Sequence, residues 1–158
     1  ETESEKIYQL IISDLRARES PDGLFVGDEV WIAPEFAEGD SLFYSWDGDM
    51  DVDDELVDGL KRANRETADF PAAEKFGPHV SVRKIESFHD LFYYRDGAKP
   101  VAAKCLVQFW RPGFSANGNR AIVRFFYGPS PHGATRTYLL ERTDRSWQIL
   151  SSTITRYL

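Results

Sequence analysis

The stretch "RAIVRFFYGPSPHGATRTYLLER", from Arg120 to Arg142, decides the fold of this chain. Its two ends, residues 120–128 and 135–142, are rich in β-branched and aromatic residues, which favour strands. The segment between them, residues 129–134, contains two Pro and one Gly, which are the residues that mark turns. The pattern therefore predicts two antiparallel strands joined by a turn, which is a β-hairpin.

The register of this hairpin follows from pairing its strands around "GPSPHG". Arg120 then falls opposite or near Glu141, and Arg124 shares a face of the sheet with Thr137. Because side chains alternate along a strand, the two adjacent phenylalanines at 125–126 point to opposite faces. Both faces therefore carry an aromatic side chain, and we expect a second domain, a protein partner or a homodimer to cover the second face.

Two further β-rich segments extend the hairpin into a meander. Residues 101–110 precede it, across a loop that holds the turn signal Asn117-Gly118, and residues 147–158 follow the tight turn "TDRS". The sequence thus predicts a four-stranded antiparallel meander. The first of these strands holds Cys105, the single cysteine, which excludes an internal disulfide and a multi-cysteine zinc site and is interpreted as a core thiol.

The first part of the chain supplies the helices. Apolar residues recur at three- and four-residue spacing in 3–18, which predicts an amphipathic helix that Ser4 is placed to cap. A second helical pattern runs from 53 to 69. Short strands are expected at 29–34, 41–46 and 80–88.

Helices followed by a long meander predict a single α+β domain over residues 1–158. In this domain the helices pack on one face of a curved antiparallel sheet. Aromatic residues make up 14% of the chain. Because a curved sheet that closes on a helix encloses bulky side chains, we expect the cone-shaped NTF2-like or cystatin-like architecture.

Charge divides the chain into two halves. Residues 1–75 carry 21 acidic and 7 basic side chains, a net −14, and residues 76–158 carry 5 and 12, a net +7, which together give −7. The overall negative charge argues against nucleic-acid binding. No apolar run approaches the roughly 20 residues of a membrane-spanning helix.

Two interpretations of the basic half stay open. Its arginines form ordinary cross-strand pairs, or some of them build an anion pocket at the mouth of the cone. The planar guanidinium fork suits a carboxylate or a phosphate. The candidate ligand-binding residues are Arg111, Arg124 and His132.

The acidic stretch "SWDGDMDVDDELVDG", residues 45–59, has an aspartate at every second position from 47 to 53. Three interpretations stay open: carboxylates that favour a helix N-terminus, pairing with arginines of the basic half, or a calcium site. The calcium-loop pattern is imperfect, because Val52 stands where the loop needs Gly. The candidate metal ligands are Asp47, Asp49, Asp51 and Asp53, and apart from calcium at this site, with modest affinity, no cofactor is expected.

No nucleophile elbow, phosphate loop, dinucleotide fingerprint or metalloprotease motif is present in the sequence. An enzyme of the cone-fold type would instead use one carboxylate or histidine in an apolar pocket. The candidate bases are His89, Asp90 and Glu86, and the candidate proton donors are Tyr93 and Tyr138.

From about residue 88 to its end the chain resembles a family of uncharacterised bacterial α+β domains that are often exported. The resemblance rests on "FWRPGFSANGNRAIVRFFYG", "HGATRTYLLER" and "SWQIL", and "DDELVDGLKRAN" is similar to the family's middle helix. It covers somewhat under half of the chain. The resemblance implies a small exported domain, and it implies no activity.

Together these observations give two hypotheses about function. The first is a non-enzymatic exported domain that binds a small ligand or a protein partner, and the alternative is an isomerase or hydrolase with a buried carboxylate or histidine. The chain starts at Glu1 rather than Met. We expect a processed or trimmed form, and removal of a secretory signal would leave such a start, so the expected location is secreted or periplasmic.

Overall fold

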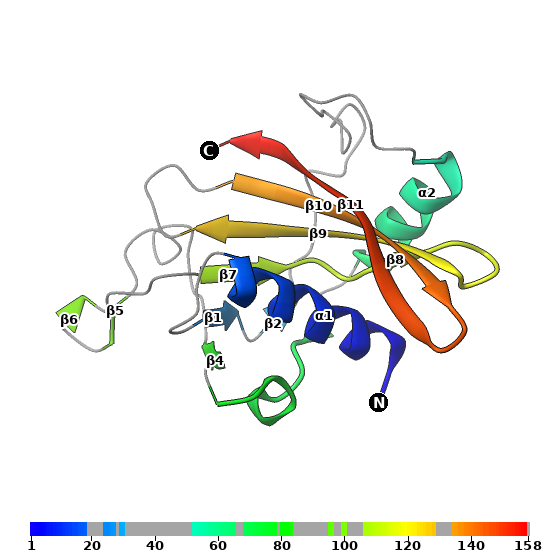
Figure 1. The fold of residues 1–158 in the computed structure, drawn as a ribbon. Helices are drawn as coiled ribbons and strands as arrows, with labels where there is room; N and C mark the ends of the chain where they lie inside the picture. The colour runs from blue at the N-terminus through cyan, green and yellow to red at the C-terminus, as the bar shows by residue number, and fades with distance from the viewer. Residues whose placement is uncertain are drawn as a thin grey trace.

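The computed structural model describes residues 1–18, 24–27, 29–30, 52–65, 68–78, 80–83, 95–96, 99–100, 106–128 and 134–157. Within these ranges the chain has an α+β fold, with helices beside a sheet of long C-terminal strands (Figure 1). Helix α1 spans Glu3–Arg18, α2 spans Asp54–Ala63, and a short 3₁₀ helix, η2, spans Ala73–Phe76. None of the helices in these ranges is long and apolar enough to cross a membrane.

The main sheet has seven strands in the order β11-β10-β9-β7-β1-β4, and β8 pairs with β9 beside this path. Strands β7 to β11 pair antiparallel, whereas β1 lies parallel to both β7 and β4. The bounds are β1 Leu24–Gly27, β4 Val80–Arg83, β7 Leu106–Phe109, β8 Gly113–Phe114, β9 Arg120–Gly128, β10 Ala134–Thr143 and β11 Ser146–Tyr157.

The predicted meander is confirmed, and so is its register. Strands β7, β9, β10 and β11 lie next to one another in that order, Arg120 pairs with Glu141, and Arg124 pairs with Thr137. The expectation that the whole sheet is antiparallel is wrong, because the two parallel strands β1 and β4 extend it. Their pairing joins residues as distant as Leu24 and Val80, so no local pattern in the sequence shows it.

The second helix is shorter than predicted. The pattern indicated residues 53–69, but α2 ends at Ala63 and Ala68–Asp69 forms strand β3. This strand pairs with β2, Glu29–Val30, in a separate two-stranded sheet. A second small sheet joins β5, Arg95–Asp96, to β6, Lys99–Pro100.

Helix α1 begins with a capping box at Thr2. The Glu5 N–H donates to Thr2 Oγ1 at 3.1 Å, and the Thr2 N–H donates to Glu5 Oε2 at 3.1 Å. This pair satisfies two backbone donors that a helix start leaves without intrahelical partners. The expectation that Ser4 caps the helix is therefore wrong, because Ser4 already lies within α1.

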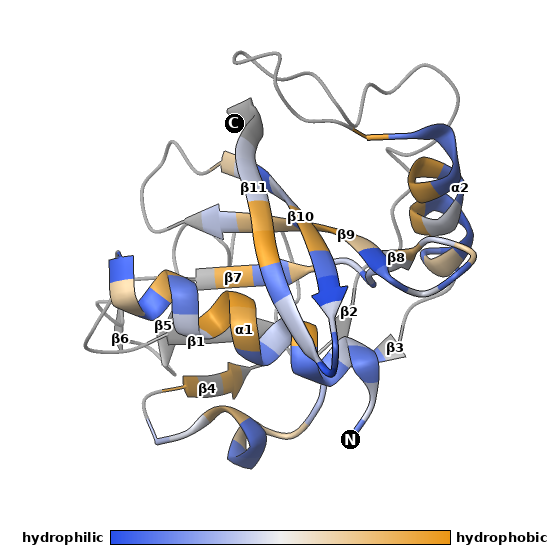
Figure 2. Cartoon of the chain, turned by 45° about the vertical axis from the view of Figure 1, so that its right-hand side comes forward, coloured by the Kyte–Doolittle hydropathy of each residue, from blue (hydrophilic) through white to orange (hydrophobic). Residues whose placement is uncertain are grey.

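The hydrophobic core lies between α1 and one face of the sheet, which we call the helix face. Figure 2 shows α1 lying across the strands, with hydrophobic and hydrophilic residues alternating along its turns. Tyr8 packs on Phe109 with ring centroids 4.8 Å apart, and Phe125 lies between Phe109 and Tyr138 at 5.3 and 5.2 Å. The buried core residues from α1 are Ile7, Tyr8, Ile11, Ile12 and Leu15.

The start of α1 is also tied to the β10–β11 turn. Glu3 Oε2 accepts a hydrogen bond from Trp147 Nε1 at 2.7 Å and lies 3.4 Å from Arg142 Nη1, while Glu3 Oε1 pairs with Lys6 at 2.9 Å. The hydrogen bonds from Lys6 and Trp147 lower the pKa of the Glu3 carboxyl to about 2. One carboxylate therefore joins the start of α1 to the end of β10 and the start of β11.

Candidate functional site

The face of the sheet that points away from α1 carries buried polar side chains among its apolar ones. Because residues alternate along β9, Phe125 faces α1 and Arg124 faces the other way, together with its cross-strand partner Thr137. We call this set the polar row: Gln108 (1% exposed), Arg124 (2%), Thr135 (4%) and Thr137 (1%). Glutamine, arginine and threonine are mostly exposed in proteins, so four of them buried on adjacent strands require an explanation.

Arg124 contacts an aromatic ring. The guanidinium carbon Cζ lies 5.3 Å from the ring centroid of Trp110, within the range of a cation–π interaction. The backbone holds the same pair together, because the Trp110 N–H donates to the Arg124 carbonyl at 3.1 Å. Trp110 is itself only 2% exposed, so this contact is shielded from water. Cation–π attraction is strongest between groups that are shielded in this way.

Apolar side chains surround the polar row on the same face. Phe126 stands opposite Thr135, and Ile122 stands opposite Leu139, and all three apolar side chains are buried. All four residues of the polar row make further interactions within the chain. The face thus combines one guanidinium, two hydroxyls and one amide with an apolar surround, which is the composition of small-molecule sites.

Arg111 follows Trp110, and its electrostatic contact is with Tyr8. Its side chain is exposed, and its positive charge acts on Tyr8, opposing the rise in the pKa of the Tyr8 hydroxyl that burial causes. Tyr8 belongs to the core on the helix face and donates to the Trp110 carbonyl at 3.3 Å. Among the contacts of the described residues, none joins the Arg111 side chain to Arg124, and His132 lies outside the described residues.

Asn64 was missed by the sequence interpretation, and it fixes the backbone at residue 111. Asn64 Oδ1 accepts from the Arg111 N–H at 2.6 Å, and Asn64 Nδ2 donates to the Arg111 carbonyl at 2.8 Å. The same Nδ2 donates to the Leu60 carbonyl at 2.9 Å, and Asn64 is only 3% exposed. This side chain ends α2 and attaches it to the chain that leaves β7.

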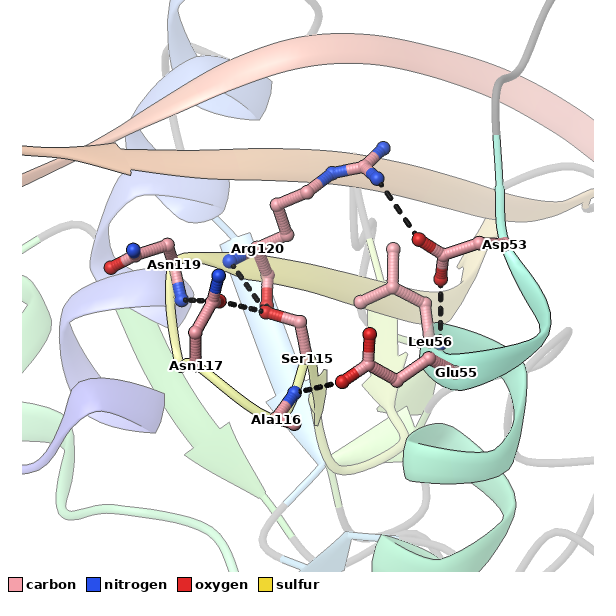
Figure 3. A network of polar contacts seen from close by, with 8 residues as sticks. All are labelled: Asp53, Glu55, Leu56, Ser115, Ala116, Asn117, Asn119 and Arg120. Atoms are coloured by element: carbon pink, nitrogen blue, oxygen red, sulfur yellow. Dashed lines mark hydrogen bonds and ion pairs between the residues drawn. The ribbon is translucent and has the colours of Figure 1, made fainter.

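Asp53, in the middle of the acidic stretch, holds α2 against the sheet. Asp53 Oδ1 caps α2 by accepting from the Leu56 N–H at 3.0 Å, and Asp53 Oδ2 pairs with Arg120 Nη1 at 3.2 Å (Figure 3). The helix-cap and arginine-pairing interpretations are both observed at this aspartate. The other candidate metal ligands, Asp47, Asp49 and Asp51, lie outside the described residues, and the calcium site stays a prediction.

A second contact joins α2 to the β8–β9 turn. Glu55 Oε1 accepts a hydrogen bond from the Ala116 backbone N–H (Figure 3). With the Asp53–Arg120 pair this contact forms what we call the α2 clasp: Asp53, Glu55, Ala116 and Arg120. Beneath it α2 meets β8 backbone to backbone, since a Cβ added at Gly113 would lie 2.3 Å from Leu60 N.

Tyr138, a candidate proton donor, is already engaged. Its hydroxyl donates to Asp14 Oδ2 at 2.8 Å, and Asp14 Oδ1 pairs with Arg18 Nε at 3.0 Å. Burial first, and then the bond to Asp14, raise the pKa of Tyr138. The remaining candidate acid–base residues, Glu86, His89, Asp90 and Tyr93, lie outside the described residues.

The chain matches no protein-family model, no curated protein and no solved structure at a significant level. The chemistry of the candidate site therefore follows from its residues alone. A buried guanidinium presents N–H donors in a fixed plane, and hydroxyl and amide groups beside it can donate or accept. This arrangement suits recognition of one anionic group on an otherwise apolar molecule.

Proposed function

We propose that this protein is a non-enzymatic binding domain for a small anionic ligand, which it takes at the polar row. The single observation that carries the proposal is the buried guanidinium of Arg124 against Trp110, flanked by the buried polar side chains Gln108, Thr135 and Thr137. Arginine binds carboxylates and phosphates through two parallel hydrogen bonds, which gives both affinity and orientation.

A purely structural role is a poorer account of the polar row. Removing a charge from water costs several kcal/mol, and replacing buried charges by apolar side chains of similar volume is often neutral or stabilising. A well-packed apolar side chain of similar volume at 124 would therefore serve stability alone equally well. Recognition of a ligand gives a reason for a cation at this position.

The neighbours of Arg124 narrow the ligand class. Arg124 is the only charged residue in the polar row, which suits one carboxylate or one phosphate rather than a polyphosphate. Phe126, Ile122 and Leu139 on the same face suit an apolar body. We therefore favour a small organic acid with a single anionic group.

Access to the site requires movement. Arg124 and Trp110 are each 2% exposed, so a ligand reaches them only after a conformational change exposes them. Association that waits for a conformational change is slower than the usual range of about 10⁵–10⁷ M⁻¹s⁻¹. Slow, saturable association is the expected kinetic signature.

The test is a titration with benzoate and, separately, with inorganic phosphate, followed by tryptophan fluorescence and thermal unfolding. The chain has four tryptophans, so Trp110→Phe assigns the signal. A ligand at a hundredfold excess over its Kd should stabilise the parent by about 2.7 kcal/mol. Arg124→Lys, which keeps the charge but loses the fork, and Thr137→Val, which loses only the hydroxyl, should both weaken binding.

The matched control is Arg136→Lys. Arg136 sits on the helix face, opposite Phe125, and its guanidinium lies 4.5 Å from the Tyr127 ring centroid, so it is a second arginine in a comparable cation–π contact. This variant should bind as the parent does. If neither anion changes the fluorescence or the melting temperature of the parent, or if Arg136→Lys weakens binding as much as Arg124→Lys, the proposal is wrong.

Three expectations from the sequence stay predictions: export, the NTF2-like or cystatin-like cone, and a homodimer or protein partner that covers a sheet face. The enzyme alternative also stays a prediction, although the single hydroxyl proton of Tyr138 is committed to Asp14 in this structure.

A further inference from the structure

The β8–β9 turn holds Asn117 followed by Gly118, and this pair is chemically labile. Asparagine is among the thermolabile residues of proteins, because its side-chain carbonyl can react with the next backbone nitrogen. Glycine leaves that nitrogen uncrowded, and a Cβ at Gly118 would meet nothing within 4 Å. Asn117 is exposed, so water reaches the side chain.

The turn holds the Asn117 side chain in a defined orientation (Figure 3). Asn117 Oδ1 accepts from Ser115 Oγ at 2.8 Å and from the Asn119 N–H at 2.9 Å. Two donors on one carbonyl oxygen stabilise the negative charge that collects there when a nucleophile attacks the carbon, as in an oxyanion hole. Within the described residues the leaving nitrogen Nδ2 makes no hydrogen bond that would hold it in the turn.

One contact opposes the reaction. The Gly118 N–H donates to the Ser115 carbonyl at 2.9 Å, and this nitrogen must lose its proton to attack Asn117. The attack therefore requires a local opening of the turn. Residues whose reaction needs such an opening react at a rate set by the population of the open state.

We propose that Asn117-Gly118 is a self-modification site whose rate is controlled by the docking of α2. The Gly118 nitrogen attacks Asn117 Cγ, and the new C–N bond closes a succinimide ring. The Cγ–Nδ2 bond breaks, and ammonia leaves with the proton from the Gly118 amide. Water then opens the ring at either carbonyl, which gives aspartate or isoaspartate at position 117.

The α2 clasp supplies the control. Glu55 holds the Ala116 N–H one residue before Asn117, and Asp53 holds Arg120 at the other end of the turn. Both carboxylates come from the first turn of α2 or its cap. While α2 is docked, the turn between these two anchors is restrained and Gly118 stays hydrogen-bonded to Ser115. When α2 separates from the sheet, the turn is free to cyclise.

The two products differ in their effect on the turn. Aspartate at 117 keeps an oxygen that accepts from Ser115 and Asn119, so the turn survives. Isoaspartate moves the side-chain methylene into the main chain, which displaces Gly118 from the Ser115 carbonyl and separates the two anchors of the clasp. Isoaspartate formation therefore disrupts the clasp and leaves the packing on β8 and the Asn64 contacts to hold α2.

The experiment is incubation of the full chain at mildly alkaline pH, with the products at each asparagine followed by peptide mass spectrometry. The chain contains its own controls, since Asn119 lies in the same exposed turn but precedes Arg120, and Asn64 is buried. Glu55→Ala removes one anchor of the clasp and leaves the reacting residues unchanged. It should speed conversion at Asn117 by roughly fivefold, the factor that about 1 kcal/mol carries.

The expected result is ammonia loss at Asn117 alone, slow in the parent and faster in Glu55→Ala. Asn117→Asp should melt close to the parent, because only the isoaspartate product disrupts the turn. The rate of conversion at Asn117 in the urea-unfolded chain gives the upper limit for the folded protein. The proposal is overturned if the folded parent never converts while the unfolded chain does, or if Glu55→Ala converts no faster than the parent.

Discussion

Replacing Gly113 with alanine tests whether α2 is held by direct backbone packing on β8. The new Cβ would lie 2.3 Å from Leu60 N, 2.5 Å from Leu60 Cα and 2.9 Å from the Gly59 carbonyl carbon. These atoms are all main chain of α2, so no side-chain rotation relieves the overlap. Either α2 or β8 must therefore shift as a whole to relieve the overlap.

The loss of unfolding free energy caused by Gly113→Ala lies between two limits. If α2 shifts but stays packed, the overlap costs about 1–3 kcal/mol, the usual range for an overfilled core. If α2 separates, Leu56 and Leu60, which are both 0% exposed, lose burial worth about 1.5–3 kcal/mol each. We expect a loss of about 3 kcal/mol, which lowers the Tm of a chain of this size by roughly 6–12 °C.

Urea unfolding followed by far-UV circular dichroism, with scanning calorimetry for the Tm, measures this loss. The matched control is Gly118→Ala in the same hairpin, where φ is +71° and nothing lies within 4 Å, so only the backbone conformation costs energy, about 1–2 kcal/mol. A Gly113→Ala variant within about 0.5 kcal/mol of the parent, or no less stable than Gly118→Ala, would refute backbone packing as the attachment of α2.

Three further predictions concern the polar contacts. Asp53→Ala should lower the free energy of unfolding by about 1 kcal/mol, because α2 loses its helix cap. A double-mutant cycle with Arg120→Ala, measured by urea unfolding, should give a coupling energy no larger than about 1 kcal/mol, because the ion pair is partly exposed. A larger coupling energy would contradict the assigned geometry. Tyr138→Phe should lower the free energy of unfolding by about 1–3 kcal/mol, because Asp14 loses a hydrogen-bond donor; an unchanged urea midpoint would show that the bond is not formed. The pKa of Glu3 falls from 4.5 to about 2 on folding, so the stability that its carboxylate contributes is present above pH 4.5 and is lost as the pH falls toward 2. Glu3→Gln should flatten the pH dependence of the unfolding midpoint in that window. An unchanged slope would argue against the contacts of Glu3 with Lys6 and Trp147.

The local patterns of the sequence were enough to determine α1 and the meander. The three-to-four-residue spacing in 3–18 corresponds to α1, and the alternation in 120–128 and 135–142 fixed both the strands and their register. Short turns explain this success, because strands joined by a few residues have few ways to pair. The pairing of Arg124 with Thr137 followed from the same reasoning.

Only the tertiary structure decided the rest, because the contacts involved join residues far apart in the chain. The parallel strand β1 enters the sheet through partners some fifty or more residues away, and α2 ends where Asn64 binds the backbone of Arg111. The sequence identified Arg124 as a candidate but gave no sign that Trp110 contacts its guanidinium. Periodicity shows which face a side chain occupies, whereas burial and partners depend on which distant segments pack against that face.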